Sequence, residues 1–253
     1  MTDSFAPLRH ALDSFAEAGK TARFWLRDDD AVEPTAALDR LLALGADHHV
    51  PLTLAVIPQF TGPALAAHLQ GLAVEVAPHG WSHANHSPPN VKSCELGPER
   101  AAPAVLDELA TGLAHLRDLH GNRAVPVLVP PWNRIDPALI PLLPALGFRG
   151  LSVFGPEMGN PPPMHINVHV DLIDWHGTRG ARDPSVVVAD IVNRLAVVQE
   201  TGAVVGYMTH HRVHDAAAWD FTGRLFAITA THPGASWHRL SDLLAAADQT
   251  SQI

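Results

Sequence analysis

Residues 35–69, TAALDRLLALGADHHVPLTLAVIPQFTGPALAAHL, decide the fold class, because helix, strand and helix patterns follow one another within them. Leucines recur on one stripe over residues 35–48, which predicts an amphipathic helix. Residues 51–57 form a continuous apolar run of strand length, which is typical of a strand buried on both faces. Residues 64–69 return to a helical pattern.

The same alternation continues along the chain. Further strands are predicted at residues 23–26, 73–77, 125–129, 151–154, 166–172 and 202–208. Further helices are predicted at residues 104–119, 137–146, 186–199 and 240–247. Repeated strand–helix units favour parallel strands with crossover helices, and about seven units fit a barrel better than a small open sheet. Because no linker or internal repeat interrupts them, we expect one α/β domain over residues 1–253.

Composition excludes several classes of protein. Hydrophobic residues make up 47% of the 253 residues and charged residues 17%, so a sizeable core is expected rather than disorder. The net charge is −9 and Lys and Arg do not cluster, so no nucleic-acid partner is expected. A single cysteine, Cys94, excludes a disulfide framework and a Cys-rich zinc module.

Targeting signals are not evident in the sequence. The amino-terminal residues lack the apolar core of a signal peptide, and no stretch has the length of a membrane span. We therefore expect a cytoplasmic protein with no membrane span, and its oligomeric state stays open.

Histidine is unusually frequent, with 17 residues, which points to metal binding or proton transfer. Polar residues also follow the predicted strands repeatedly. These clusters are Asp28–Asp30, His79 with His83 and His86, Pro130–Asn133, Asp171 with Asp174 and Trp175, and His210 with His211 and His214. Reactive groups of a parallel α/β barrel lie on loops at the carboxyl ends of its strands, so we expect these clusters to form one site.

Each cluster has a functional and a structural interpretation. The three adjacent aspartates are consistent with a solvated loop. They are also consistent with a site where a bound cation offsets their mutual repulsion. His79 and His83 are either ordinary surface histidines or two ligands of a metal site. Such a site would have two imidazoles, one carboxylate and coordination positions left open for water. Zinc suits such a donor set, as do cobalt, nickel, manganese and iron.

The remaining clusters carry similar alternatives. His210 and His211 fit a solvated strand end, or a general acid whose pKa and tautomer an acidic partner such as Asp171 would set. Trp132 follows a stiff Pro-Pro pair and fits either a cap on the core or a stacking surface for a sugar.

The order of these clusters resembles the polysaccharide deacetylases (carbohydrate esterase family 4, the NodB-homology fold). The family motif H-[ST]-x-x-H resembles residues 79–83, HGWSH, and D-x-x-D-W resembles residues 171–175, DLIDW. The strand ending in L-x-H resembles residues 208–210, MTH. R-P-P-[WFY]-G is matched in part by residues 129–133, VPPWN, and T-F-D-D-G loosely by residues 27–31, RDDDA.

This resemblance implies a distorted (β/α)7 barrel and a divalent metal, with zinc the first choice. The implied ligands are Asp30, His79 and His83. The implied catalytic residues are Asp29 as the base that activates water, His210 as the acid that protonates the leaving amine, and Asp171 as its partner. The residues implied for substrate and oxyanion contacts are Trp132, Arg27 and Asp174. The implied reaction is hydrolysis of an N-acetyl or other N-acyl group on a sugar or glycan precursor.

The chain departs from the family pattern in three ways. Val129 stands where the family has an arginine that orients the base, and we hypothesise that Arg27 or Arg134 replaces it. The triple aspartate permits Asp28 as base with Asp29 as ligand, although Ala31 at the small family position favours Asp29 and Asp30. His211 is an alternative to His210 as the acid.

Three hypotheses follow. The first is a metal-dependent N-deacetylase whose partner is a carbohydrate. The second is a metal-dependent amidohydrolase acting on a small non-sugar amide. The third is a non-catalytic member that binds a carbohydrate or a metal, which the loss of the motif arginine favours and the retained aspartates and histidines oppose.

Overall fold

The computed structural model describes residues 3–157 and 163–250, with the backbone alone for residues 247–250. Contacts divide the chain into two units, which are described separately. Unit 1 comprises Met1–Asp28, Thr35–Leu52 and Val168–Arg239, and unit 2 comprises Asp29–Pro34, Thr53–Asn167 and Leu240–Ile253. The expected single domain over residues 1–253 stays a prediction.

Unit 1 is built on parallel strands. Its strands are β1 (Ala22–Ala31, as far as Asp28), β7 (Val170–Asp171), β8 (Val204–Thr209) and β9 (Ala235–Trp237). Strand β1 pairs with both β8 and β9, and β7 pairs with β8, all in parallel. The register places Asp28 opposite Thr209 and Asp171 opposite Met208. The polar residues at these strand ends therefore share the carboxyl edge of one sheet.

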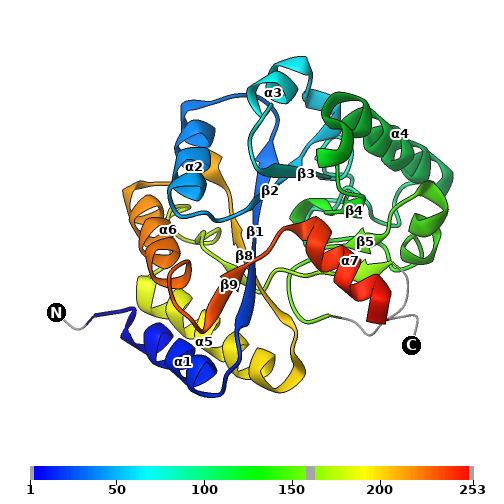
Figure 1. Cartoon of the computed structure of the whole chain (residues 1–253). Helices are drawn as coiled ribbons and strands as arrows, with labels where there is room; N and C mark the ends of the chain where they lie inside the picture. Colours follow the sequence, from blue (N-terminus) through cyan, green and yellow to red (C-terminus); the bar gives the residue numbers. More distant parts are fainter. Residues whose placement is uncertain (1–2, 158–162, 251–253) are drawn as a thin grey trace. The chain divides into compact units, whose positions relative to one another are not determined.

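The helices of unit 1 each bury a largely apolar face. They are α1 (Ala6–Glu17), α2 (Ala36–Asp47), α5 (Pro184–Thr201) and α6 (Ala216–Thr229), with the 3-10 turn η5 (His211–Val213) (Figure 1). Helix α1 packs along α5. Side-chain caps fix the first turns of α2 and α6. Thr35 accepts a hydrogen bond from the Leu38 N–H at the start of α2, and Asp215 accepts one from the Ala218 N–H at the start of α6.

Unit 2 continues β1 from Asp29 and adds short parallel strands. These are β2 (Leu52–Val56, from Thr53), β3 (Val74–Pro78), β4 (Val127–Leu128), β5 (Gly150–Leu151) and β6 (Met164–His165). Strands β4, β5 and β6 pair in parallel in that order, and β3 lies beside β2. The described strands are thus arranged in open parallel sheets, which confirms the predicted α/β class.

Helices and 3-10 turns cover the strands of unit 2. They are α3 (Pro63–His68), α4 (Ala102–His120), α7 (Leu240–Thr250), η1 (Pro58–Phe60), η2 (Gly121–Arg123), η3 (Pro131–Asn133) and η4 (Ile140–Leu146) (Figure 1). Leucines of α4 pack with Leu128, Phe148 and Leu151 in a fully buried cluster. The predicted helix at residues 137–146 is instead the 3-10 turn η4, because Pro141 and Pro144 lack the N–H groups that an α-helix needs there.

Other element predictions also required correction. Within the predicted strand at residues 166–172, only Val170–Asp171 forms a strand, β7. Asn167 lies before it, and its side chain accepts a hydrogen bond from the Val153 N–H and donates to the carbonyls of Gly155 and Pro156. Helices α1 and α6 and strands β6 and β9 are additional to the elements predicted. Among the described residues, no helix combines the length and apolar character needed to cross a membrane.

Candidate metal and proton-transfer site

Strand pairing in unit 2 brings Asp30 and His79 to neighbouring positions. The Ala31 carbonyl, one residue after Asp30, accepts a hydrogen bond from the Ile57 N–H, just past β2. The His79 N–H, just past β3, donates to the Val56 carbonyl at 2.8 Å. Three consecutive strands therefore end together. The side chains that follow them converge because the strands are parallel.

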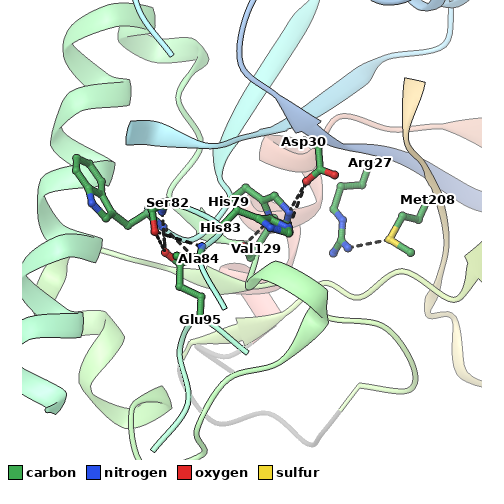
Figure 2. A network of polar contacts seen from close by, with 10 residues as sticks. Arg27, Asp30, His79, Ser82, His83, Ala84, Glu95, Val129 and Met208 are labelled. Atoms are coloured by element: carbon green, nitrogen blue, oxygen red, sulfur yellow. Dashed lines mark hydrogen bonds and ion pairs between the residues drawn. The ribbon is translucent and has the colours of Figure 1, made fainter. Parts of the chain in front are cut away.

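The convergence produces a cluster of three potential metal ligands. His79 Nε2 lies 3.2 Å from Asp30 Oδ1, and His83 Nε2 lies 3.4 Å from the same oxygen (Figure 2). One donor atom from each residue falls within 4.8 Å of the other two. His79 is buried, whereas Asp30 and His83 are half-buried. Two imidazoles and one carboxylate, open on one side, fit a catalytic divalent metal.

The surroundings of the two imidazoles favour ligation through Nε2. His79 Nδ1 lies 3.0 Å from the Val129 carbonyl oxygen, which can only accept, so Nδ1 carries a proton and Nε2 is the nitrogen that faces Asp30. Burial and the neighbouring His79 lower the pKa of His83 below 6.5, although Asp30 opposes them. Two imidazole nitrogens beside one carboxylate are a donor set that zinc and similar ions bind.

Several residues in and beside these ligand segments have a left-handed backbone conformation. Asp30 has a φ of 70° and His83 a φ of 57°, both in the left-handed region that residues other than glycine seldom adopt. Trp132 has a φ of 54° and its ring centroid lies 4.3 Å from that of His83. Strained residues persist where surrounding contacts fix them, and they gather at functional sites.

The loop that carries His83 is held by a residue that sequence reasoning missed. Glu95, which is fully buried, accepts hydrogen bonds from the Ser82 N–H at 2.7 Å and the Ser82 Oγ at 3.0 Å (Figure 2). The Trp81 N–H lies 3.3 Å from both carboxylate oxygens. Glu95 lies 12 residues beyond His83 in a segment without periodic pattern, so no sequence signal indicated this contact.

Unit 1 contains a separate buried pair, Asp28 and His211. The Asp28 carboxylate accepts hydrogen bonds from the Thr209 hydroxyl at 2.6 Å, the His211 N–H at 2.8 Å and the His211 Nδ1. Burial alone would raise the pKa of Asp28, but His211 and Thr209 together lower it below 3.8. Asp28 is therefore an ionised hydrogen-bond acceptor that fixes the ring of His211.

His210 and Asp171 of unit 1 both contact Trp175. The Trp175 ring meets the His210 ring edge-on at 4.6 Å between centroids, and its Nε1–H donates to Asp171 Oδ2 at 2.8 Å. The other Asp171 oxygen accepts from the Ile173 N–H at 2.9 Å. Trp175 thus fixes the Asp171 carboxylate and flanks His210.

Three further predicted residues have defined surroundings. Arg27 is fully buried in unit 1, and its Nη2 donates to Met208 Sδ at 2.9 Å (Figure 2). Arg134 of unit 2 donates from Nη1 to the Ser93 carbonyl at 2.7 Å. Asp174 accepts from the N–H groups of Gly177 and Thr178, as an acid in a tight turn does.

Comparison with known proteins places this arrangement in a fold family. Searches of protein-family models and of curated proteins give no match. Among solved structures, a protein from Mycobacterium smegmatis assigned as a polysaccharide deacetylase matches with a TM-score of 0.71 and 16% identity over 92% of both chains. The chain has the polysaccharide deacetylase fold. The expected NodB-like α/β fold is thereby confirmed; the described strands form no closed barrel, which the expected distortion allows.

Two further structures with the deacetylase fold match at lower similarity. A family 4 carbohydrate esterase from Streptomyces lividans, solved in complex with acetate, has a TM-score of 0.58 and 15% identity over 88% of this chain and 94% of its own. A family 4 acetyl xylan esterase from Clostridium thermocellum, solved with a cobalt ion, has a TM-score of 0.55 and 16% identity over 88% and 91%.

On this deacetylase fold, the predicted residues fall into two groups by unit. Unit 2 brings Asp30, His79, His83 and Trp132 together, and it also carries Asp29, which is buried. Unit 1 brings Asp171 and His210 together around Trp175, and pairs Asp28 with His211. The roles given to all these residues stay predictions.

Proposed function

We propose that this chain is a metal-dependent hydrolase that removes an N-acetyl or other N-acyl group from a sugar or glycan precursor. The cluster of Asp30, His79 and His83 carries the proposal, because its donor atoms converge, Val129 fixes the His79 ring and one side stays open. The deacetylase fold and the carbohydrate esterases that share it support the same reaction class.

Asp30, His79 and His83 would hold a divalent ion, with zinc the first choice. When bound, such an ion supplies Lewis-acid chemistry to the scissile carbonyl and its attacking water. Val129 supports this role through its carbonyl, since the hydrogen bond to His79 Nδ1 fixes the ring and directs Nε2 to the cluster.

We assign the general base to Asp29 rather than Asp28. Both oxygens of Asp28 already accept hydrogen bonds from Thr209 and His211, so that carboxylate is committed to holding them. Asp29 adjoins the candidate ligand Asp30 and is buried, which suits a carboxylate that takes a proton from water.

We assign the general acid to His210, with Asp171 as its partner. Asp171 is anchored by Trp175 and Ile173, and Trp175 also flanks the His210 ring. An imidazole can give a proton to a leaving amine at neutral pH, and a nearby carboxylate can set its orientation. A cytoplasmic location and a soluble sugar substrate belong to the same proposal.

Acetate release tests the proposal directly. Zinc-loaded protein is incubated with N-acetyl sugars, small non-sugar amides and ureides, and released acetate or amine is measured. We expect turnover of at least one N-acetyl sugar and none with Asp29→Asn. Turnover confined to the non-sugar amides would move the assignment to an amidohydrolase. Failure to bind any divalent ion would overturn both enzymatic assignments.

One observation favours a second candidate, a non-catalytic member that binds carbohydrate. Val129 occupies the position of the motif arginine, and the structures sharing this fold include a family 4 pseudoenzyme, at a TM-score of 0.59 and 15% identity. Binding of a sugar to metal-loaded protein without acetate release would support this candidate.

A further inference from the structure

Glu95 is buried in unit 2 beside the loop that carries His83. Its side chain takes the Ser82 N–H at 2.7 Å, the Ser82 hydroxyl at 3.0 Å and the Trp81 N–H at 3.3 Å. These three donors come from the two residues that precede His83. A buried carboxylate is costly unless it is hydrogen-bonded, so this arrangement fixes the loop and satisfies the acid together.

Gly80 makes room for that carboxylate. The pattern H-[ST]-x-x-H has a hydroxyl residue at this position, whereas this chain has Gly80 with a φ of 57°. A Cβ at position 80 would lie 2.1 Å from Glu95 Oε2 and 2.7 Å from the ring of Pro131. The space that a side chain at position 80 would fill is therefore occupied by the acid of Glu95.

The segment around Glu95 is itself anchored within unit 2. Leu96 forms an isolated parallel bridge with Ile135, and its carbonyl accepts from the Asp136 N–H at 2.8 Å. Arg134 donates to the Ser93 carbonyl at 2.7 Å. The carboxylate is thus presented from a fixed backbone.

His83 depends on this support more than its two neighbours do. Asp30 lies on β1 and His79 directly follows β3, so strand hydrogen bonds place both. His83 lies on a loop with a left-handed φ, directly after Ser82, whose Oγ also accepts from the Ala84 N–H at 3.3 Å. The contacts of Glu95 therefore set where His83 Nε2 points.

We propose that Glu95 is a positioning residue that presets the metal-binding loop, holding His83 ready to ligate before the ion arrives. The inference rests on the proposed function, because it takes His83 as a ligand. Outer groups that orient ligands contribute to metal affinity, and their loss typically lowers it by about 10–100-fold.

Glu75 offers a matched control in the same unit. It is also buried, and it accepts hydrogen bonds from the Ser241 N–H at 3.1 Å and the Ser241 hydroxyl, at the start of α7. Glu95→Gln and Glu75→Gln therefore each disturb a buried glutamate that binds one serine. Only the first touches the loop of His83.

The experiment measures Zn²⁺ dissociation constants by competition with a chromogenic chelator, and amide hydrogen exchange of the metal-free proteins. We expect Glu95→Gln to weaken Zn²⁺ binding about 10–100-fold and to speed exchange at Trp81 and Ser82. Glu75→Gln should lower stability and leave the Zn²⁺ affinity unchanged. Ser82→Ala, a milder change, should weaken binding less, and it replaces Glu95→Gln if that variant does not fold.

The outcomes separate the two proposals. If the parent binds Zn²⁺ and Glu95→Gln binds it as tightly, the positioning role is wrong while the proposed function stands. Equal loss of Zn²⁺ affinity in Glu95→Gln and Glu75→Gln would also overturn the positioning role. It would show that the affinity falls because the whole protein is destabilised, and not because the loop of His83 is released. A parent that binds no Zn²⁺ overturns the proposed function, and the role of Glu95 toward a ligand with it.

Discussion

Asp28 holds His211 at two points, because its carboxylate accepts both the backbone N–H, at 2.8 Å, and the ring Nδ1. Asp28 ends the part of β1 that belongs to unit 1, and His211 begins the turn after β8. Both residues are almost completely buried. The pair therefore ties the turn after β8 to its neighbouring strand and fixes the tautomer of His211.

We expect Asp28→Asn to destabilise the protein by about 3–5 kcal/mol, because it breaks a buried pair and leaves polar partners unsatisfied. Asp190→Asn, which removes a half-exposed ion pair with Arg182, should cost no more than about 1 kcal/mol. Urea unfolding at pH 7 measures both. The pKa of Asp28 in the folded protein lies below its ordinary value of 3.8. The stability that the ionised Asp28 contributes is therefore fully present above pH 3.8 and is lost as the pH falls through the folded-state pKa. Equal destabilisation by the two variants would contradict the prediction.

Substitution of either histidine in the candidate metal cluster should remove the ion. His79→Ala and His83→Ala each leave two ligands, so Zn²⁺ affinity should fall by more than the roughly 10–100-fold that outer-shell changes cost. His86→Ala is the control, because His86 lies exposed on the same loop. Metal content after dialysis measures the effect. Retention of one equivalent of zinc by His83→Ala would exclude that residue from the ligand set.

The sequence predicted those parts of the fold that periodicity marks. Residues 51–57 became β2 (Leu52–Val56), and residues 104–119 became α4 (Ala102–His120), because long apolar runs and stripes have few alternatives. Strand β9 has only three half-buried residues, too few to show a period. Helix α6 is apolar on many sides, and its start is marked mainly by the cap of Asp215.

The candidate site was predictable where its residues are adjacent to strands. Asp30 and His79 each lie at a strand end, so the parallel arrangement brings them together. The pairing of Asp28 with His211 depends on the register of β1 against β8, which no local pattern reveals. Glu95 was missed for a similar reason, since its contact with Ser82 depends on the path of an irregular loop.

Replacing His210 should slow the reaction and leave the metal in place. His210→Ala should retain zinc and lose about 10²–10⁴-fold in rate, as expected for a general acid. The matched variant His211→Ala tests the alternative acid, and it should lower stability because Asp28 loses its partner. Acetate release, metal content and unfolding are measured on both. If His210→Ala also lost its zinc, or if only His211→Ala lost rate, the assigned acid would be wrong.

His120 should make the protein less stable in mild acid. It is buried at the end of α4, and neither ring nitrogen has a hydrogen-bond partner among the described residues. Burial, with Arg123 and His115 nearby, lowers the pKa of His120 from 6.5 to about 4. Between these values the unfolded chain binds the extra proton, so stability should rise with pH and be lost as the pH falls from 6.5 towards 4. Protonation of His120 should lower the free energy of unfolding by about 1–3 kcal/mol over this pH range.

His120→Leu tests this contribution, because leucine fits an apolar site and does not titrate. Urea unfolding at several pH values between 4 and 7 should give a shallower dependence for His120→Leu than for the parent. Part of the slope should remain, because burial also lowers the pKa of His214 to about 4. His10→Leu, an exposed position on α1, is the control and should keep the parent's slope. If His120→Leu kept the full slope, the acid sensitivity would have to arise from other groups.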